Sequence, residues 1–424
     1  MTRRETERYC AQHILVDGAK ENEPRSERIY CPLDSTHSVW KKDLQRHLKK
    51  CQSKKSSQLP TDSWFLQNVN DSRQDGIQSS SNPILHSEYI EWIGFVQEEY
   101  NRIVTEQSLL PANESVLVKT DMPLLQHSGL DRRLSELSNQ KHAIQQASLI
   151  AHLERYNLVR PENHFVEFGA GRGELSRYLH QVLIIANHQR LSVNPSFLLV
   201  DRAGTRMKLD SKIAKDAAEL DSSCRHPNVR RFKVDIKDLA LYKDACFEMN
   251  PENTGSGLVA ISKHLCGAAT DLTIQCLANY SSSDRNVIPV SGILIALCCR
   301  HRCTFSTFPR SYVESLRPIT SRGFEILTKM TSWAVCGRRQ DSRPDQCDHV
   351  HERDAPLNPT TEQDKYLHPS KLPIEEREII GIKARQIIDY ARARHLQSLG
   401  FKVELVRYVD QSVSSENICL IAVP

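Results

Sequence analysis

The second half of the chain alternates short apolar runs with longer stretches that have the hydrophobic period of a helix. The apolar runs are HFVEFG (164–169), FLLVD (197–201), VRRFKVD (229–235), LVAISKH (258–264) and GILIALCC (292–299). Such alternation is typical of a parallel sheet with helices on both faces. Two later runs, FKVELVRYV (401–409) and NICLIAV (417–423), predict an antiparallel pair. The pattern predicts an α/β fold with a mostly parallel, doubly wound sheet and a C-terminal antiparallel hairpin.

The rest of the chain departs from this alternation. Helical periodicity occurs near 87–105 and 139–157, and a late helix is predicted from one apolar face made of Ile380, Ala384, Ile387, Ile388 and Ala391. The polar, Pro-punctuated stretch 338–373 predicts an insertion within the sheet domain. We therefore expect four parts: a Cys/His-rich region 1–51, a flexible linker 52–84, a helical part 85–158 and a sheet domain 159–424.

The composition is that of an ordinary globular protein, with 39% hydrophobic and 25% charged residues among 424. No apolar run approaches the length of a membrane span, so we expect no membrane partner. The polar N-terminus (MTRRETERYC) predicts a protein that is not secreted and works in the cytoplasm or nucleus. In that setting the thirteen cysteines indicate reduced thiols or metal ligands.

Charge is concentrated at the N-terminus. Residues 1–55 hold 13 Lys/Arg against 8 Asp/Glu, a net charge of +5, whereas the whole chain carries only +4. A basic arm on a nearly neutral body suits a polyanionic partner, although a solvated tail would have the same composition.

The basic region contains a set of metal-ligand residues in CPLDSTHSVWKKDLQRHLKKC (31–51). We predict a zinc finger over 29–52 with ligands Cys31, His37, His47 and Cys51. His47 and Cys51 are four residues apart in a helical pattern, so both project from one face. Because so small a finger has almost no core, metal binding would supply folding free energy on the order of 10 kcal/mol. Upstream, Cys10 and His13 form only half of a second set.

The first apolar run of the sheet domain ends in a Gly-rich turn, VEFGAGRG (166–173). Gly169, Gly171 and Gly173 permit a tight turn and close approach of a ligand to the backbone. This spacing resembles the first motif of class I S-adenosylmethionine methyltransferases, which would direct Glu167 at the methionine amino group. A nicotinamide-binding turn, whose third glycine comes one position later, and a plain structural turn are the alternatives.

Two further acids follow the next two apolar runs. Asp201 is placed to accept hydrogen bonds from both ribose hydroxyls of a nucleoside cofactor. The resemblance to class I methyltransferases assigns Asp235 to the adenine. Each acid alone is equally compatible with a helix N-cap.

The chain as a whole resembles the eukaryotic tRNA 2′-O-methyltransferases that modify nucleotide four of the acceptor stem. The segments that carry the resemblance are the Cys/His finger, KHAIQQASLIAHLE (141–154), VEFGAGRG (166–173), KHLCGAATDL (263–272), CCRHRC (298–303), MTSWAVCG (330–337) and VSSEN (413–417). The resemblance implies a Rossmann-like methyltransferase domain behind the zinc region, with S-adenosylmethionine and zinc as cofactors and tRNA as partner. Relatives carry a CCCH-type half before the finger, of which Cys10 and His13 are what remains.

Ribose methylation needs a base close to the 2′-hydroxyl. Lys263 is the first candidate and His264 the second, since both follow a buried strand near the expected cofactor. A role for Lys263 in binding a phosphate is as compatible with the sequence as a role as base. His264 is likewise compatible with a structural, hydrogen-bonded histidine. The CCRHRC cluster with Cys266 offers either a second metal site or packed thiols. Arg300 and Arg302, with Arg230, Arg231, Arg338 and Arg339, are candidates for phosphate contact.

The sequence thus predicts an S-adenosylmethionine-dependent tRNA ribose 2′-O-methyltransferase. Two other classes remain open at this point: a catalytically silent zinc-finger RNA-binding protein with a degenerate Rossmann-like domain, and a nicotinamide oxidoreductase.

Overall fold

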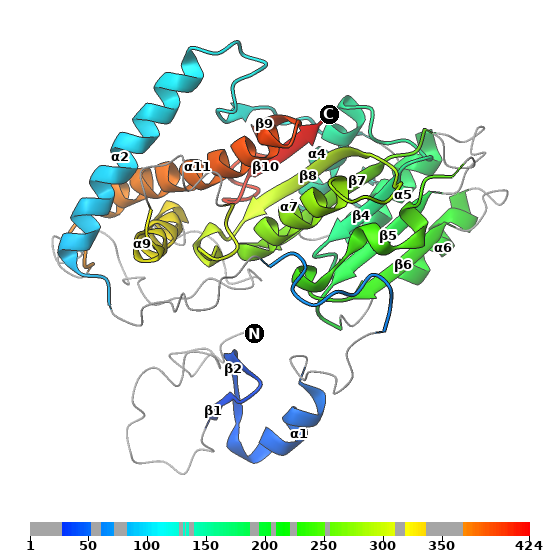
Figure 1. Ribbon diagram of the computed structural model, residues 1–424, viewed down its shortest axis with the longest axis horizontal. Coiled ribbons are helices and arrows are strands. Elements are labelled where there is room, and N and C mark those ends of the chain that lie inside the picture. The colour runs from blue at the N-terminus through cyan, green and yellow to red at the C-terminus, as the bar shows by residue number, and fades with distance from the viewer. Residues whose placement is uncertain are drawn as a thin grey trace. The chain divides into compact units, whose positions relative to one another are not determined.

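An eight-stranded sheet organises the larger of two compact units in the computed structural model (Figure 1). The structure describes residues 28–51, 61–71, 83–126, 130–131, 133–134, 140–186, 195–204, 209–220, 227–250, 255–309, 319–335 and 368–424. Spatial strand order is β3-β9-β10-β8-β7-β4-β5-β6. The strands are β3 (Lys119–Thr120), β4 (His164–Phe168), β5 (Ser196–Asp201), β6 (Asn228–Lys233), β7 (Leu258–Cys266), β8 (Val290–Cys298), β9 (Lys402–Arg407) and β10 (Ile418–Val423).

The direction of the strands confirms the predicted fold class. β4 to β8 are mutually parallel, while β10 runs antiparallel to both β8 and β9. The chain starts the parallel sheet at β4, adds β5 and β6 on one side, and then β7 and β8 on the other. The order therefore reverses beside β4, and ligands of such sheets bind beyond the carboxyl ends of the strands at that point.

Helices cover both faces of this sheet, because neighbouring strand residues alternate between two cores. Phe165 faces the core shared with α4 and α5, whereas Val166 faces the core shared with α7, α9 and α11. The helices of this unit are α2 (His86–Ser108), α4 (Lys141–Arg155), α5 (Glu174–Ala186), α6 (Asp210–Leu220), α7 (Ala268–Ser281), α9 (Ser321–Thr331) and α11 (Ile374–Ser398). Short 3₁₀ turns are η2 (Ile236–Asp238), η3 (Leu241–Lys243), η4 (Ala245–Phe247), η6 (Arg300–Arg302) and η7 (Ser332–Val335).

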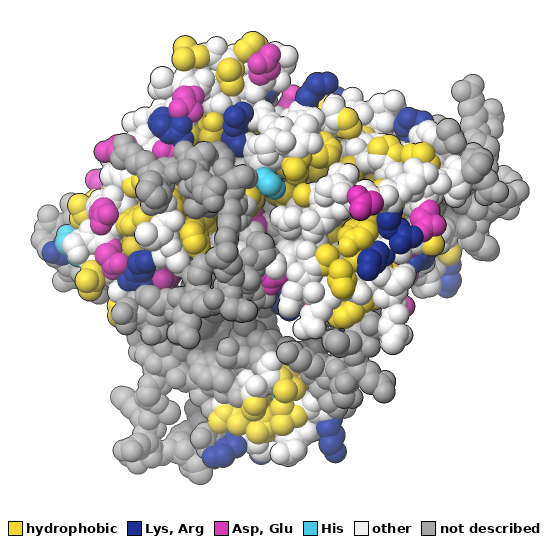
Figure 2. Space-filling view, in the orientation of Figure 1, with side chains coloured by type: hydrophobic (Ala, Val, Ile, Leu, Met, Phe, Trp, Pro, Cys, Tyr) yellow, Lys and Arg dark blue, Asp and Glu magenta, His cyan; other side chains and the backbone are white. Residues whose placement is uncertain are grey.

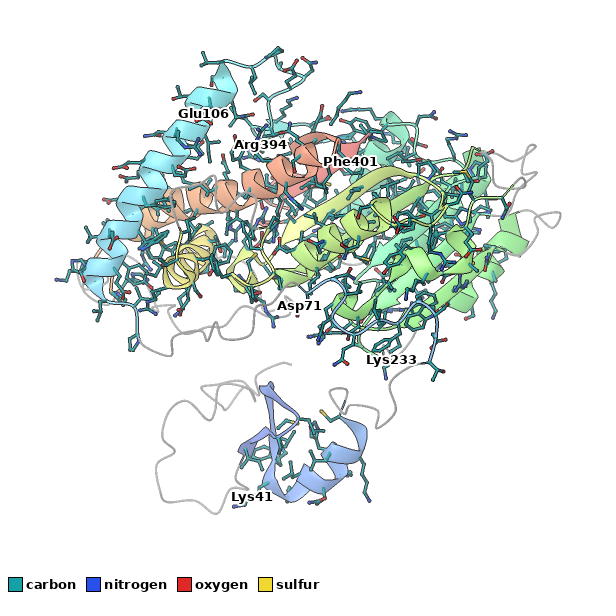
Figure 3. All side chains as sticks on the ribbon, viewed as in Figure 1. Lys41, Asp71, Glu106, Lys233, Arg394 and Phe401 are labelled. Carbon is teal, nitrogen blue, oxygen red and sulfur yellow. The ribbon has the colours of Figure 1, made fainter. Side chains whose placement is uncertain are left out.

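The long helices confirm the predicted helical patterns. α2 and α4 coincide with the patterns near 87–105 and 139–157, and the five apolar positions predicted for the late helix are all buried in α11. Side chains fill the space between α2 and α11, whose Glu106 and Arg394 are labelled in Figure 3. None of the described helices combines the length and the hydropathy that a membrane span requires.

One segment of the expected linker packs against the large unit. Within 61–71, the indole of Trp64 stacks on Phe232 at a centroid distance of 4.2 Å. Asn70 donates to the backbone oxygens of Ile236 and Leu239 at 2.6 and 2.7 Å. An aromatic ring and a buried amide hold this stretch in place, which its polar composition did not predict. The rest of 52–84, apart from 83–84, lies outside the described residues.

The segment before α11 is held in a similar way. The expected insertion spans 338–373, of which 338–367 lies outside the described residues. His368 is buried, and its ring lies 5.2 Å from that of Trp333. The last residues of the expected insertion therefore belong to the core that supports α11.

The smaller unit contains a hairpin followed by a helix. β1 (Arg28–Cys31) pairs antiparallel with β2 (Asp34–Trp40), and η1 (Lys41–Asp43) leads into α1 (Leu44–Lys50). Cys51 ends the helix with an extended backbone. The hairpin turn and the end of the helix thus bring the first and last residues of the predicted ligand set within the same small unit.

Candidate active site and zinc centre

Three of the four predicted zinc ligands meet in the smaller unit. The Cys31 and Cys51 sulfurs lie 3.7 Å apart, and His47 Nε2 lies 3.1 Å from the Cys31 sulfur. Both cysteines are buried, and the three ligand atoms lie within 4.8 Å of one another. The β2 backbone includes His37, whose side chain lies outside the described residues, as do Cys10 and His13. Two thiolates and an imidazole at this spacing fit three corners of a zinc tetrahedron.

In the larger unit, the Gly-rich turn after β4 has the backbone that only glycine adopts without strain. Gly169 and Gly171 have φ angles of 64° and 50°. A Cβ on Gly169 would lie 2.5 Å from the backbone oxygen of His264, so the turn touches β7 directly. Among the described residues, a Cβ on Gly171 would meet no atom within 4 Å. The space beside Gly171 is therefore open to a ligand.

Asp201, at the end of β5, holds this turn in place. Its carboxylate accepts hydrogen bonds from the backbone N–H of Gly171 at 2.8 Å and of Ala203 at 2.7 Å. Arg231 donates to the Gly171 carbonyl from the other side at 2.9 Å. A carboxylate has about four acceptor positions. Asp201 therefore keeps acceptor capacity for ribose hydroxyls beside the open space.

The other two predicted acids make different contacts. Glu167 is buried, and its carboxylate accepts from the Ser176 N–H at 3.1 Å and hydroxyl at 2.6 Å. Burial raises the pKa of Glu167 to about 7. Glu167 thus anchors the first turn of α5 through one carboxylate oxygen, and its contact with a methionine amino group stays a prediction. Asp235 accepts from the Lys237 N–H at 3.2 Å and caps η2.

The two candidate bases lie in a bulge of β7. Pairing with β8 shifts register between Ser262 and Leu265, just past the end of β4. Bulges of this kind redirect side chains and are common next to active sites. Here the bulge buries Lys263 and exposes His264.

Lys263 is paired with a histidine that sequence reasoning missed. Its Nζ lies 2.7 Å from Nδ1 of His142, near the start of α4. Burial lowers the pKa of Lys263 to about 8, while Glu174 and Glu167 favour its charged form. Partial burial and the lysine charge lower the pKa of His142. The signal was available, because His142 belongs to the KHAIQQ segment, but no residue spacing connects it with Lys263.

The two histidines flank the lysine at the surface. The His142 and His264 rings are 6.1 Å apart at an interplanar angle of 72°, and both are accessible to solvent. Surrounding protein atoms, then Lys263 and His142, lower the pKa of His264. Both imidazoles are therefore neutral at pH 7 and able to donate and accept hydrogen bonds. The carboxyl edge of the sheet thus combines an open Gly-rich turn, an acid and a group able to take up a proton.

Comparison with known proteins agrees with this geometry. The family model described as Methyltransferase TRM13 matches residues 144–423. The chain belongs to the TRM13 methyltransferase family. A second model, described as the U11-48K-like CHHC zinc finger, matches residues 28–52. The resemblance inferred from the sequence motifs is confirmed, and the TRM13 family implies S-adenosylmethionine as methyl donor.

Several curated relatives share the name "tRNA:m(4)X modification enzyme TRM13". The one from Yarrowia lipolytica is 36% identical, covering 99% of this chain and 86% of its own length. Those from Saccharomyces cerevisiae and Schizosaccharomyces pombe are 34% and 35% identical, covering 99% and 93% of this chain and 92% and 95% of their own. No solved structure matches the chain significantly.

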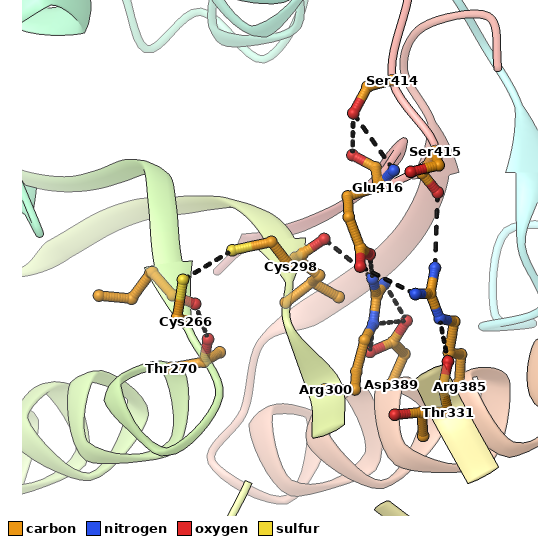
Figure 4. Close-up of polar contacts among 12 residues, drawn as sticks. Cys266, Thr270, Cys298, Arg300, Thr331, Arg385, Asp389, Ser414, Ser415 and Glu416 are labelled. Atoms are coloured by element: carbon orange, nitrogen blue, oxygen red, sulfur yellow. Dashed lines mark hydrogen bonds and ion pairs between the residues drawn. The ribbon is translucent and has the colours of Figure 1, made fainter. Parts of the chain in front are cut away.

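In this TRM13-family chain, three of the four candidate phosphate-binding arginines that the structure describes are paired with acidic side chains. Arg300 is buried and bonded to Asp389 at 2.6 Å and to Glu416 at 2.5 Å (Figure 4). The predicted phosphate contact of Arg300 is therefore wrong, because the guanidinium is part of the core. Arg230 and Arg231 pair with acidic side chains. Arg302 is exposed, and Arg338 and Arg339 lie outside the described residues.

Proposed function

We propose that this chain transfers a methyl group from S-adenosylmethionine to the ribose 2′-hydroxyl of nucleotide four in the tRNA acceptor stem. One juxtaposition carries the proposal: the Lys263–His142 pair lies at the carboxyl edge where the turn at Gly171 opens and Asp201 ends β5. The names of the curated relatives, which describe modification of position four in tRNA, support this substrate.

The cofactor is proposed to lie on the Gly-rich turn. Gly171 would let the backbone approach it, whereas Gly169 packs against β7 and Gly173 against Leu199 of β5. Asp201 would accept hydrogen bonds from the ribose hydroxyls. Asp235 would contact the adenine, as the resemblance implies, and Glu167 would fix the first turn of α5. When bound, S-adenosylmethionine supplies an activated methyl group on a sulfonium, so the protein mainly orients the hydroxyl for in-line transfer.

Lys263 is proposed as the general base. In its neutral form the Nζ lone pair accepts the proton of the 2′-hydroxyl. The resulting ammonium donates to Nδ1 of neutral His142, while Glu174 and Glu167 stabilise its charge. Burial makes the neutral form accessible near pH 8, which an exposed lysine would not be. His264 is proposed to contact the nucleotide and hold the hydroxyl beside Lys263.

The zinc finger is proposed to hold the tRNA outside the reactive edge. Cys31, His37, His47 and Cys51 would bind the ion, and the finger lies in the region with a net charge of +5. A second contact on the same tRNA raises the local concentration of substrate at the active site.

The test is incubation of the full chain with labelled S-adenosylmethionine and bulk tRNA, followed by mapping of the modified nucleotide. We expect label at nucleotide four that resists alkaline cleavage, since the 2′-oxygen is blocked. Asp201→Ala should abolish transfer without changing zinc content. Asp284→Ala, an exposed aspartate between α7 and β8, is the matched control and should transfer normally. Absence of cofactor binding with retained tRNA binding would favour the silent RNA-binding alternative, and binding of a nicotinamide cofactor would favour an oxidoreductase.

A further inference from the structure

A second group of cysteines lies at the same edge of the sheet as the proposed active site. Cys266 and Cys298 are direct partners in the β7–β8 pairing, and their sulfurs lie 3.6 Å apart (Figure 4). The sulfur of Cys299 completes the group, since all three sulfurs lie within 4.8 Å of one another. This three-sulfur group has no part in the proposed transfer.

The backbone is strained at Cys299, the residue that contributes the third sulfur. Cys299 has φ 48° and ψ 45°, a left-handed conformation that a residue with a Cβ adopts at a cost. The turn that follows is fixed on both sides. Arg300 donates to the Leu297 carbonyl at 3.0 Å, and a Cβ on Gly267 would lie 2.4 Å from the Arg302 carbonyl carbon. The loops after β7 and β8 therefore hold the three sulfurs in fixed positions.

The finger provides a reference for this spacing within the same chain. Its two cysteine sulfurs are 3.7 Å apart, against 3.6 Å between Cys266 and Cys298. Zinc–sulfur bonds of about 2.3 Å in a tetrahedron place the sulfurs about 3.8 Å apart. All of these cysteines are free thiols, so no disulfide accounts for the approach.

Two other described cysteines, Cys276 and Cys303, behave as ordinary core thiols. Cys303 accepts a hydrogen bond from Arg392 at 3.0 Å, and Cys276 contacts the Leu239 carbonyl at 3.5 Å. Both are buried, and neither belongs to a group of metal-ligand residues. Cys303 was part of the predicted CCRHRC cluster, but its side chain joins the Arg392 network instead.

We infer that Cys266, Cys298 and Cys299 bind a second zinc-type cation, which ties the ends of β7 and β8 together. Three thiolates are a ligand set that selects soft or borderline divalent ions. His301, two residues after Cys299, lies outside the three-sulfur group, so it would have to turn toward the ion to act as the fourth ligand. Cys266 comes three residues after Lys263, so the ion would also fix the bulge that carries the proposed base. The site is independent of the finger.

The test is the zinc content of the full chain, measured by mass spectrometry on parent and variants. Cys298→Ser should lose about one zinc per chain relative to the parent. Cys276→Ser, the same change at a core thiol, should lose none. His47→Ala should lose the zinc of the finger, and the double variant with Cys298→Ser should lose both. A folded Cys298→Ser chain that keeps the parent zinc content would overturn the inference. A Cys266–Cys298 disulfide in the purified parent, found by mapping without reductant, would overturn it as well.

A second measurement tests the same inference if the Cys298→Ser chain does not fold. Cobalt is loaded into His47→Ala, in which the finger is disabled, and the absorption spectrum is recorded. Intense tetrahedral d–d bands with sulfur-to-cobalt charge transfer are expected, and Cys299→Ser should weaken the charge-transfer band. An octahedral spectrum without charge transfer in His47→Ala would exclude a thiolate site in the larger unit. Neither readout depends on methyl transfer, so this proposal and the proposed function can fail separately.

Discussion

Lys263 and His142 show how burial can prepare an ordinary side chain for proton transfer. A lysine in water holds its proton throughout the neutral range. Here burial lowers the lysine pKa to about 8, and the histidine 2.7 Å away accepts a hydrogen bond without adding charge. The nearby Glu174 limits the shift by favouring the ammonium. The balance leaves a sizeable neutral fraction just above neutral pH, which suits a base.

The rate of methyl transfer should therefore depend on the protonation of Lys263. Because the base must be neutral, the single-turnover rate should rise with pH and level off above about pH 8. Lys263→Arg keeps the positive charge but stays protonated, so it should lose the rising limb and most of the rate. The measurement is the rate from pH 6 to 9.5 at saturating cofactor. A rate that falls with rising pH in the parent would identify Lys263 as a phosphate clamp instead.

Two glycines of the turn should respond differently to alanine. Gly171→Ala adds a methyl group to open space, so the fold should tolerate it at about 1–2 kcal/mol of backbone strain while cofactor affinity falls at least about tenfold. Gly169→Ala places the methyl group against the His264 backbone and should destabilise the large unit itself. Calorimetric titration with S-adenosylmethionine and thermal unfolding distinguish the two effects. Unchanged cofactor affinity in Gly171→Ala would contradict the proposed cofactor position.

At the residue scale, the sequence predicts a position in the fold where one short segment contains the whole signal. Asp201 lies at a strand end and the glycines in a turn, as predicted, because both features have local patterns. Their role in binding a cofactor stays a prediction. His142 was missed because it meets Lys263 across 121 residues of chain. Arg300 was misread for the same reason, since its partners Asp389 and Glu416 lie far along the sequence. Contacts between segments that are distant in the sequence are set by tertiary packing, and the spacing of residues along the chain does not predict them.

At the scale of elements, the strands were predictable and their irregularities were not. Seven strands were found from buried apolar runs, and the antiparallel direction of the last pair followed from a short connection. The bulge at Lys263 and His264 requires knowledge of the partner strand, because register is a property of a pair. The ordered conformation of residues 61–71 likewise depends on a residue of another element, because Trp64 stacks on Phe232 of β6.

Helices α2 and α11 each contain a glycine, and the two glycines allow a matched pair of substitutions. Gly94 lies within α2, and a Cβ there would meet none of the described residues within 4 Å. Gly94→Ala should therefore stabilise the protein by about 0.5–1 kcal/mol through helix propensity. Gly381 lies in α11, where a Cβ would be 2.3 Å from the backbone nitrogen of Ala334. Gly381→Ala should cost about 1–3 kcal/mol, because backbone atoms must move.

Thermal unfolding of the full chain measures both effects as opposite shifts of the transition midpoint. Equal shifts for Gly94→Ala and Gly381→Ala would show that α11 does not rest directly on η7. The comparison needs no ligand, so it tests the packing of the helical layer apart from any function.

For the whole molecule, charge is distributed unevenly between the N-terminal region and the rest of the chain. On the face drawn in Figure 2, the Lys/Arg and Asp/Glu side chains described in the larger unit are interspersed rather than gathered by sign. The N-terminal 55 residues, by contrast, have a net charge of +5. Attraction to a polyanion falls with salt in proportion to the number of phosphates contacted. The finger region should therefore account for much of the salt dependence of tRNA binding.

Disabling the finger should weaken tRNA capture and leave the chemical step intact. His47→Ala removes one zinc ligand, so the finger should lose its metal and its fold. The KM for tRNA should rise at least about tenfold, with a shallower salt dependence, while kcat and S-adenosylmethionine affinity stay at the parent values. Gln45→Ala, at an exposed position of the same helix α1, is the control and should retain zinc and KM. If kcat falls with KM unchanged, the finger acts on the geometry of transfer, and its role as a separate tRNA contact has to be given up.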